Sequence, residues 1–252
     1  MTRHPFVSFA VFALTLCGCY AVPVVNTPDS PMEMIRVVNE MEKAGNPDKI
    51  DIKTLRISYK GMIALNGITM DMVSCFKAPD KLRNEVTVPG MPKTINVFDG
   101  VNGWNCTVGM GTKPISGREL DFFRIQVKMA NPENRLTDVF PQVTLDKNKA
   151  SVDGVSCYRI VATPPNDITI PPIELFVDSQ TYLTRKLVMI APTAMGDIPC
   201  TTTTGDYRKI GGIMVPGSQR TQMLGMDVAA TLIKCEVNPP LADSLFTQPE
   251  DN

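Results

Sequence analysis

Histidine is nearly absent from this sequence: His4 is the only one, and it lies in an N-terminal segment with the features of a secretory signal. Removal of that segment leaves a protein without imidazole, the commonest general base of enzymes and a common metal ligand. Its absence excludes Ser-His-Asp and Cys-His catalysis and any histidine-ligated metal. Lysine, carboxylate and tyrosine chemistry remain, but no catalytic motif accompanies them. We therefore predict a protein that is not an enzyme and that uses no metal and no cofactor.

Clustered cysteines are also lacking. Two of the seven cysteines, Cys17 and Cys19, lie in the N-terminal segment. The other five are widely spaced and contain no Cys-x-x-Cys pair, which disfavours a zinc site. Five is an odd number, so they cannot all pair with one another, and most lie among strand-like residues, where a free cysteine behaves as a small hydrophobe. We expect mostly buried thiols, with a disulfide as the less favoured alternative. These five are Cys75, Cys106, Cys157, Cys200 and Cys235.

There is no excess of positive charge, since 25 lysines and arginines stand against 26 aspartates and glutamates. Proteins that bind nucleic acid usually carry a basic surface, so we predict no nucleic-acid partner. The glycine-rich stretch GMGTKPISG, residues 109–117, contains a lysine and a threonine but not in the order of a phosphate-binding loop. We interpret it as a flexible connection.

Long hydrophobic runs are missing except at residues 6–16, and that run is too short to span a membrane comfortably. It follows Arg3 and no acidic residue, which is typical of an export signal. The run ends in Leu16-Cys17-Gly18-Cys19, which is similar to the lipobox of bacterial lipoproteins. In that reading Cys19 receives a diacylglycerol and becomes the N-terminus. Ordinary cleavage after Ala21 is the alternative.

The organisation that follows has four parts. We predict a lipoprotein signal peptide over residues 1–18, a proline-containing tether over 19–30, a single domain over 31–249 and a frayed tail over 250–252. The length after the signal suits one large β domain and allows a sizeable core.

Hydrophobic periodicity predicts the elements of that domain. Residues 30–45 have apolar side chains at helical spacing, with Ser30 as a possible cap. From residue 52 the period changes to two, which indicates a meander of short antiparallel strands with a tight turn at residues 66–67. Residues 116–140 indicate one or two helices, after which strands resume. We predict an α+β fold, a strongly curved open antiparallel sheet or half-barrel with helices packed in or over its concave face.

Several strand-turn-strand phrases spread over nearly the whole domain resemble the bacterial outer-membrane lipoprotein-sorting proteins of the LolA/LolB fold. The resemblance implies an open half-barrel whose mouth is filled or covered by helices. It also implies a cavity that receives the acyl chains of lipoproteins, although other members bind lipids or sense envelope proteins. The phrases are SCFKAPDKLRNEV (74–86), FDGVNGWN (98–105), CYRIVATP (157–164), LFVDSQTYLTRKL (175–187), GDYRKIGGIMVP (205–216) and EVNPPLADSLFTQP (236–249).

The candidate cleft residues are apolar or aromatic side chains that share faces of predicted elements. Strand alternation and helical spacing predict that a sheet face and a helix stripe face each other across an apolar space. For any one of these residues taken alone, an ordinary core position is the favoured explanation, and it is the set as a whole that indicates a cleft. The candidates are Tyr59, Met70, Met72, Phe76, Val86 and Trp104 on strands, and Leu120, Phe123 and Val127 on the helix.

We therefore predict an envelope lipoprotein whose hydrophobic cleft binds acyl chains, lipids or lipoproteins, in carriage or sorting at the outer membrane. Its lipid on Cys19 would anchor it there, facing the periplasm, as a monomer. The alternative is a structural or sensor module of the envelope that recognises a protein partner, with its cleft filled by its own helices.

Overall fold

The computed structural model describes residues 31–131, 134–193 and 196–250. The predicted signal peptide and tether, including Cys19, lie outside the described residues. In the part that is described, no helix is long and apolar enough to cross a membrane.

The helices lie where the periodicity predicts them. Helix α1 (Pro31–Gly45) carries Glu33 in its first turn and Lys43 in its last, an arrangement that suits the helix dipole. Helices α2 (Gly117–Ala130) and α3 (Leu136–Val139) occupy the second predicted helical segment. A short 3-10 helix, η1 (Asp243–Phe246), lies near the end of the chain.

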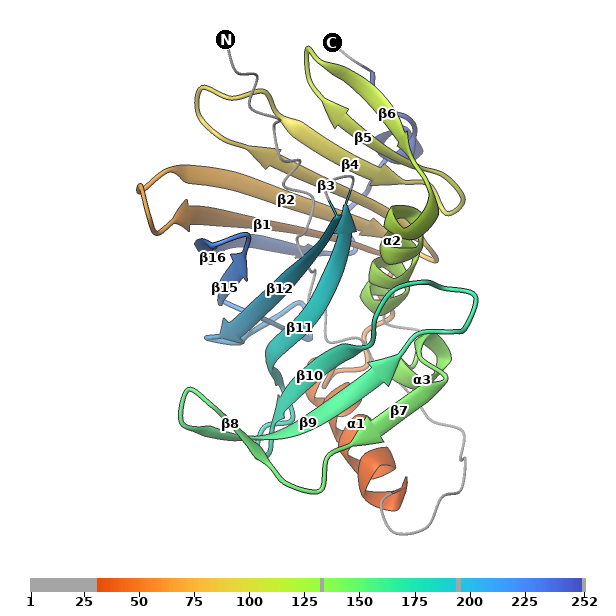
Figure 1. Cartoon of the computed structure of the whole chain (residues 1–252), viewed down its shortest axis with the longest axis vertical. Coiled ribbons are helices and arrows are strands. Elements are labelled where there is room, and N and C mark those ends of the chain that lie inside the picture. The colour runs from red at the N-terminus through yellow and green to blue at the C-terminus, as the bar shows by residue number, and fades with distance from the viewer. Residues whose placement is uncertain (1–30, 132–133, 194–195, 251–252) are drawn as a thin grey trace.

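The strands form one large antiparallel sheet that curves around α2 without closing into a barrel (Figure 1). The path from edge to edge is β6-β5-β4-β3-β2-β1-β16-β15-β12-β11-β10-β9-β7, with β8 paired to β9 off this path and β13 paired to β14 as a separate ribbon. The predicted open half-barrel is therefore confirmed. The strands are β1 (Thr54–Ile63), β2 (Thr69–Lys77), β3 (Lys81–Thr87), β4 (Thr94–Phe98), β5 (Gly103–Thr107), β6 (Gly111–Ile115), β7 (Gln142–Leu145), β8 (Ala150–Val152), β9 (Val155–Thr163), β10 (Ile173–Asp178), β11 (Thr184–Thr193), β12 (Gly196–Gly205), β13 (Arg208–Ile210), β14 (Ile213–Val215), β15 (Ser218–Met223) and β16 (Met226–Val237).

Alternation along the strands separates the two faces of the sheet. In β1 the side chains of Leu55, Ile57 and Tyr59 are buried on the concave side, whereas Arg56 and Lys60 are exposed. The alternation of buried and exposed side chains in β1 therefore matches the period of two in the sequence.

Two apolar clusters fill the concave side. The α1 cluster comprises Val37, Val38 and Met41 of α1 together with inward-facing side chains of β9 to β12. The β2 cluster comprises inward-facing side chains of β1, β2, β3 and β16, with Met70 and Phe76 among its most buried members. Helix α2 contributes side chains to both clusters, so it joins the two halves of the core.

A third cluster, the C-terminal cluster, lies on the opposite, convex face. Leu241 and Phe246 pack there against Val97 and Cys106 of β4 and β5. This segment lies within the predicted domain, which ends at residue 249. It packs on the sheet, where Phe246 is buried and covers outward-facing apolar side chains.

The stretch 109–117 differs from the prediction. Residues 111–115 form β6, an edge strand that pairs with β5, rather than a flexible connection. Gly109 and Gly111 adopt positive φ in the turn, and Pro114 is tolerated because an edge strand leaves one side of its backbone unpaired.

Candidate functional site

Helix α2 lies in the concavity of the sheet with two apolar stripes. Phe122 and Ile125 belong to the α1 cluster, whereas Phe123, Val127 and Ala130 belong to the β2 cluster. The helix therefore divides the concave side into two apolar regions and covers the border between them.

The ends of α2 are tied to the sheet by polar contacts. At its start, Arg118 donates through Nε to the carbonyl oxygen of Thr169 at 2.8 Å and pairs with Asp197 at 2.8 Å. At its end, Asn131 donates through Nδ2 to the carbonyl oxygen of Pro79 at 2.8 Å. The Arg118–Asp197 pair is exposed on both sides, so water can replace it at little cost.

The sequence-predicted cleft residues are brought together almost completely. Seven of them are buried members of the β2 cluster, and Leu120 packs against it at the margin of α2. The predicted helix stripe and strand face thus meet directly, with α2 seated on the strands. The seven are Tyr59, Met70, Met72, Phe76, Val86, Phe123 and Val127.

Trp104 lies elsewhere. It pairs with Val97 across β4 and β5, and both side chains point to the convex face, where Trp104 packs against the C-terminal cluster. Asn105 and Gly103, its neighbours in the strand, alternate with it, and Gly103 faces Leu120 of α2 on the concave side. Trp104 therefore does not line the space beneath α2.

Gln126 occupies the middle of the buried face of α2, between the two apolar stripes. It is only 7% exposed, and neither its Oε1 nor its Nε2 has a hydrogen-bond partner among the described residues. A buried polar group that loses its water without gaining a partner costs about 1–3 kcal/mol. The contact between α2 and the sheet therefore contains a destabilising group at its centre.

Further buried polar side chains lie on the concave face of β12 and β15, between the strands of the two apolar clusters. The hydroxyls of Thr202 and Thr221 lie 3.1 Å apart, and Thr204 donates to the carbonyl oxygen of Thr184 at 2.5 Å. Thr202 lies two residues after Cys200 on β12, so its side chain points to the same face as this member of the α1 cluster. Thr221 is the residue opposite Thr202 on β15. The apolar trough is thus interrupted by a polar band across its floor.

A second polar row crosses β2, β3 and β4 on the same concave face. Ser74 donates to Oδ1 of Asn84 at 2.5 Å, and Asn84 pairs in register with Asn96. All three are buried, yet Nδ2 of Asn84 and Oδ1 of Asn96 have no partner among the described residues. Sequence reasoning missed this row and Gln126, although the alternation of Asn84 with Leu82 and Val86 places it inward.

Tyr59 completes the wall of the β2 cluster. Its hydroxyl donates to the carbonyl oxygen of Pro216 at 2.9 Å. Burial raises the pKa of Tyr59 well above its usual value, so the phenol stays neutral.

The described residues contain no group of three or more His, Cys, Asp or Glu side chains placed to hold a metal ion.

No protein-family model and no curated protein sequence matches this chain. Solved structures do match. A DUF1329 family protein from Desulfovibrio piger aligns over 85% of this chain and 97% of its own, with 14% identity and a TM-score of 0.59. A LolA superfamily protein from Nitrosomonas europaea aligns over 85% and 97%, with 14% identity and a TM-score of 0.57.

A third structure, from Vibrio parahaemolyticus and described as an outer membrane lipoprotein-sorting protein domain, aligns over 85% of this chain and 96% of its own. Its identity is 11% and its TM-score 0.56. Together these likenesses show that the chain has a LolA-like fold, which confirms the resemblance that the sequence phrases suggested. At such low identity they establish the fold alone.

Proposed function

We propose that this is a bacterial envelope protein that binds the acyl chains of lipids or lipoproteins beneath α2, with α2 as a movable cover. The observation that carries the proposal is Gln126. A helix that forms a permanent part of a core has no reason to hold an unpartnered amide at the centre of its buried face.

The rest of the interface supports the same proposal. Helix α2 is held along its length by apolar contacts and at its start by an exposed ion pair. Lifting it would uncover two apolar regions, and an apolar surface of that kind is stabilised by about 25 cal/mol per Å² when a ligand covers it. A flexible, unbranched acyl chain suits a trough that contains Met70 and Met72, since methionine adapts to irregular shapes.

The proposed lining is the predicted set without Trp104. Tyr59, Met70, Met72, Phe76 and Val86 form the sheet side, whereas Leu120, Phe123 and Val127 form the helix side. Nδ2 of Asn84 and Oδ1 of Asn96, which have no partner among the described residues, border this set and would offer hydrogen bonds to a polar head.

The location is part of the proposal. A protein with a LolA-like fold and an N-terminal lipobox would act at the outer membrane, anchored through Cys19 and facing the periplasm. Intact-mass analysis of the protein isolated from its cells tests this. We expect a chain that begins at Cys19 with added lipid mass, and a chain that begins at Val22 without lipid would contradict it.

A fluorescent fatty acid tests the binding function. We expect saturable binding of one ligand per chain, together with a change in amide hydrogen exchange in α2. Leu120→Asn, at the margin of α2, should weaken binding while the protein stays folded. Ile233→Asn, on the convex face, is the matched control and should bind as the native chain does. Equal binding by both variants would contradict the proposed site.

A second candidate function is favoured by the tight seating of α2. Phe123 and Val127 are buried against the strands, so the concavity could be permanently filled and the protein could act as a module that recognises another envelope protein. In that case no fatty acid binds, and hydrogen exchange in α2 is as slow as in the central strands.

A further inference from the structure

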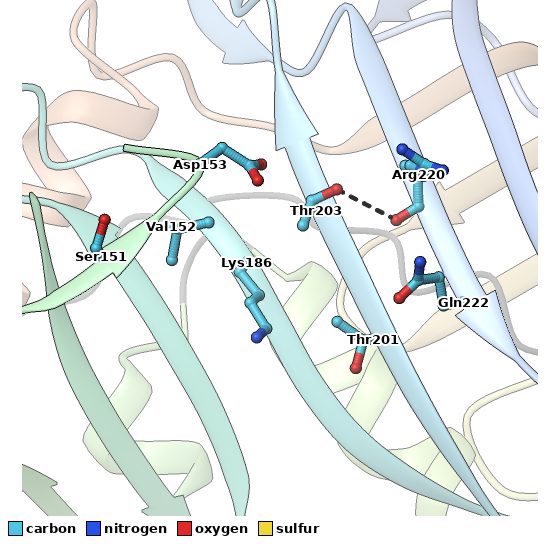
Figure 2. Close-up of a pocket in the computed structure, with 8 residues that line it drawn as sticks. All are labelled: Ser151, Val152, Asp153, Lys186, Thr201, Thr203, Arg220 and Gln222. Atoms are coloured by element: carbon cyan, nitrogen blue, oxygen red, sulfur yellow. Dashed lines mark hydrogen bonds between the residues drawn. The ribbon is translucent and has the colours of Figure 1, made fainter. Parts of the chain in front are cut away.

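A hollow of about 280 Å³ lies on the convex face of the sheet, remote from α2. Figure 2 shows the tip of the β8–β9 hairpin on one side and strands β11, β12 and β15 beneath and beside it. It is smaller than an ordinary ligand pocket and suits a small polar molecule.

The hairpin that walls the hollow is fixed in place. Val152 packs with Cys157 and Phe176 in a small apolar cluster beneath the hairpin. Asp153 and Gly154 form its turn, both with positive φ, which is the conformation of a tight two-residue hairpin. The carboxylate of Asp153 is therefore carried on a defined turn rather than on a long loop.

Most charged groups around the hollow are already paired. Arg220 donates through Nε to Asp227 at 2.8 Å, and Arg159 donates through Nε to Glu174 at 2.9 Å. Lys186 and Asp153 carry opposite charges and form no ion pair within the described part of the chain. Each acts on a charged neighbour only at longer range, Asp153 on the guanidinium of Arg220 and Lys186 on the carboxylate of Glu174. The ammonium of Lys186 instead lies 4.9 Å from the ring centroid of Phe176.

Neutral hydrogen-bonding groups lie beside these two charges. Thr201 and Thr203 of β12 and Gln222 of β15 line the side of the hollow next to Lys186 and Asp153 (Figure 2). An ion of one sign would leave one of the two charged side chains unmatched. A molecule with both an anion and an ammonium matches both, and it needs a short spacer because the two side chains stand apart.

We propose that this hollow binds a small zwitterion in which a phosphate and an ammonium are joined by a short spacer, as in phosphoethanolamine. The phosphate lies at Lys186 and the ammonium at Asp153, with the hydroxyl of Thr201 donating to a phosphate oxygen. The site is independent of acyl binding under α2, because it lies on the opposite face of the sheet.

Calorimetric titration of the full-length protein with O-phosphoethanolamine tests the site. We expect saturable binding that is at least tenfold tighter than binding of inorganic phosphate or of ethanolamine. Lys186→Ala and Asp153→Asn should each weaken it at least tenfold. Lys234→Ala and Asp51→Asn, at exposed positions away from the hollow, are the matched controls and should change nothing.

Exchanging the two charges sharpens the test. A zwitterion can turn around, so the double variant Lys186→Asp, Asp153→Lys should recover most of the affinity that Lys186→Asp alone loses. Failure to recover while the protein remains folded, phosphate binding as tight as phosphoethanolamine binding, or no saturable binding would each overturn the proposal.

Glycerophosphoethanolamine as a competitor distinguishes the source of the ligand. Displacement of phosphoethanolamine by this diester supports the head group of a lipid as the natural ligand. Retention of phosphoethanolamine supports a free phosphomonoester in the same hollow.

Discussion

The concave and convex faces of the sheet differ in whether their polar groups have partners. On the concave face, Gln126, Asn84 and Asn96 are buried and keep unpartnered atoms. On the convex face, charged side chains pair across neighbouring strands, as Lys60 does with Asp71 and Arg220 with Asp227. Many charged side chains of the convex face are thus paired with one another, apart from Lys186 and Asp153 at the hollow. The concave face keeps buried polar atoms without a partner, as a surface that receives a ligand would.

The largest expected contrast comes from placing the same charge on each face. Phe123→Asp puts an unpaired carboxylate into the contact between α2 and the sheet, where Phe123 is 5% exposed. We expect a loss of about 3–5 kcal/mol in the free energy of unfolding, measured with urea. Ile233→Asp, where the native side chain is 65% exposed, should change it by about 1 kcal/mol at most. Equal losses would remove the distinction between the faces.

Gln126→Leu should raise the free energy of unfolding, whereas Phe123→Asp lowers it. Removing the unpartnered amide stabilises the closed arrangement of α2 by about 1–3 kcal/mol. If α2 is a movable cover, the same variant binds the fluorescent fatty acid more weakly, since opening costs more. The control is Gln222→Leu on the convex face, which should stay within about 0.5 kcal/mol. Stabilisation with unchanged binding would argue that α2 does not open.

Acid should lower the free energy of unfolding by protonating the carboxylate of Asp178 on the convex face. Burial disfavours its charge, but the backbone N–H groups of Gln180 and Thr181 and the guanidinium of Arg185 donate to its carboxylate and hold its pKa below the usual value. A lowered pKa in the folded state gives stability that is present above the unfolded pKa, near 4, and is lost as pH falls through the folded pKa.

Asp178→Asn should therefore cost about 1–3 kcal/mol at pH 7 and progressively less below pH 4, measured by urea unfolding at several pH values. Asp51→Asn, an exposed aspartate paired with Lys53, is the control and should show almost no effect at either pH. A penalty for Asp178→Asn that does not change with pH would contradict the assignment.

The smallest effect is expected at an exposed ion pair of the convex face. Lys234 and Glu236 lie 2.8 Å apart on β16, and the side chain of Lys234 is well exposed. Lys234→Ala should change the free energy of unfolding by less than about 0.5 kcal/mol. A larger loss that persists at high salt would indicate that this face contributes more than finishing the surface.

Much of the fold follows from periodicity. Residues 55–60 alternate strictly, so the inward position of Leu55, Ile57 and Tyr59 is readable from the sequence, as is the helical stripe of Leu120, Phe123 and Val127. Edge and end segments are harder to predict. Strand β6 contains Gly111 and Pro114, which are unfavourable in a central strand and acceptable only at an edge, and the sequence does not show which strand is the edge.

The site was predicted in part for a similar reason. An apolar residue that alternates with polar neighbours along a strand can be assigned to the buried face from the sequence. Trp104 suits either face, and its side depends on the register in which β5 pairs with Val97 of β4. Gln126 and Asn96 resemble surface residues in composition. Their burial results from how α2 and the strands pack in three dimensions, and no local pattern encodes that packing.

The position of β16 has a consequence for the order of folding. This strand is the last in the chain, yet it lies between β1 and β15 in the middle of the sheet. The meander β1 to β6 and the meander β7 to β15 can each form local hairpins as soon as their residues are available. They become one sheet only when residues 226–237 pair with both, a contact between segments about as distant in sequence as this domain allows. Contacts of such long range are slow to form, so we expect the central seam of the sheet to close last.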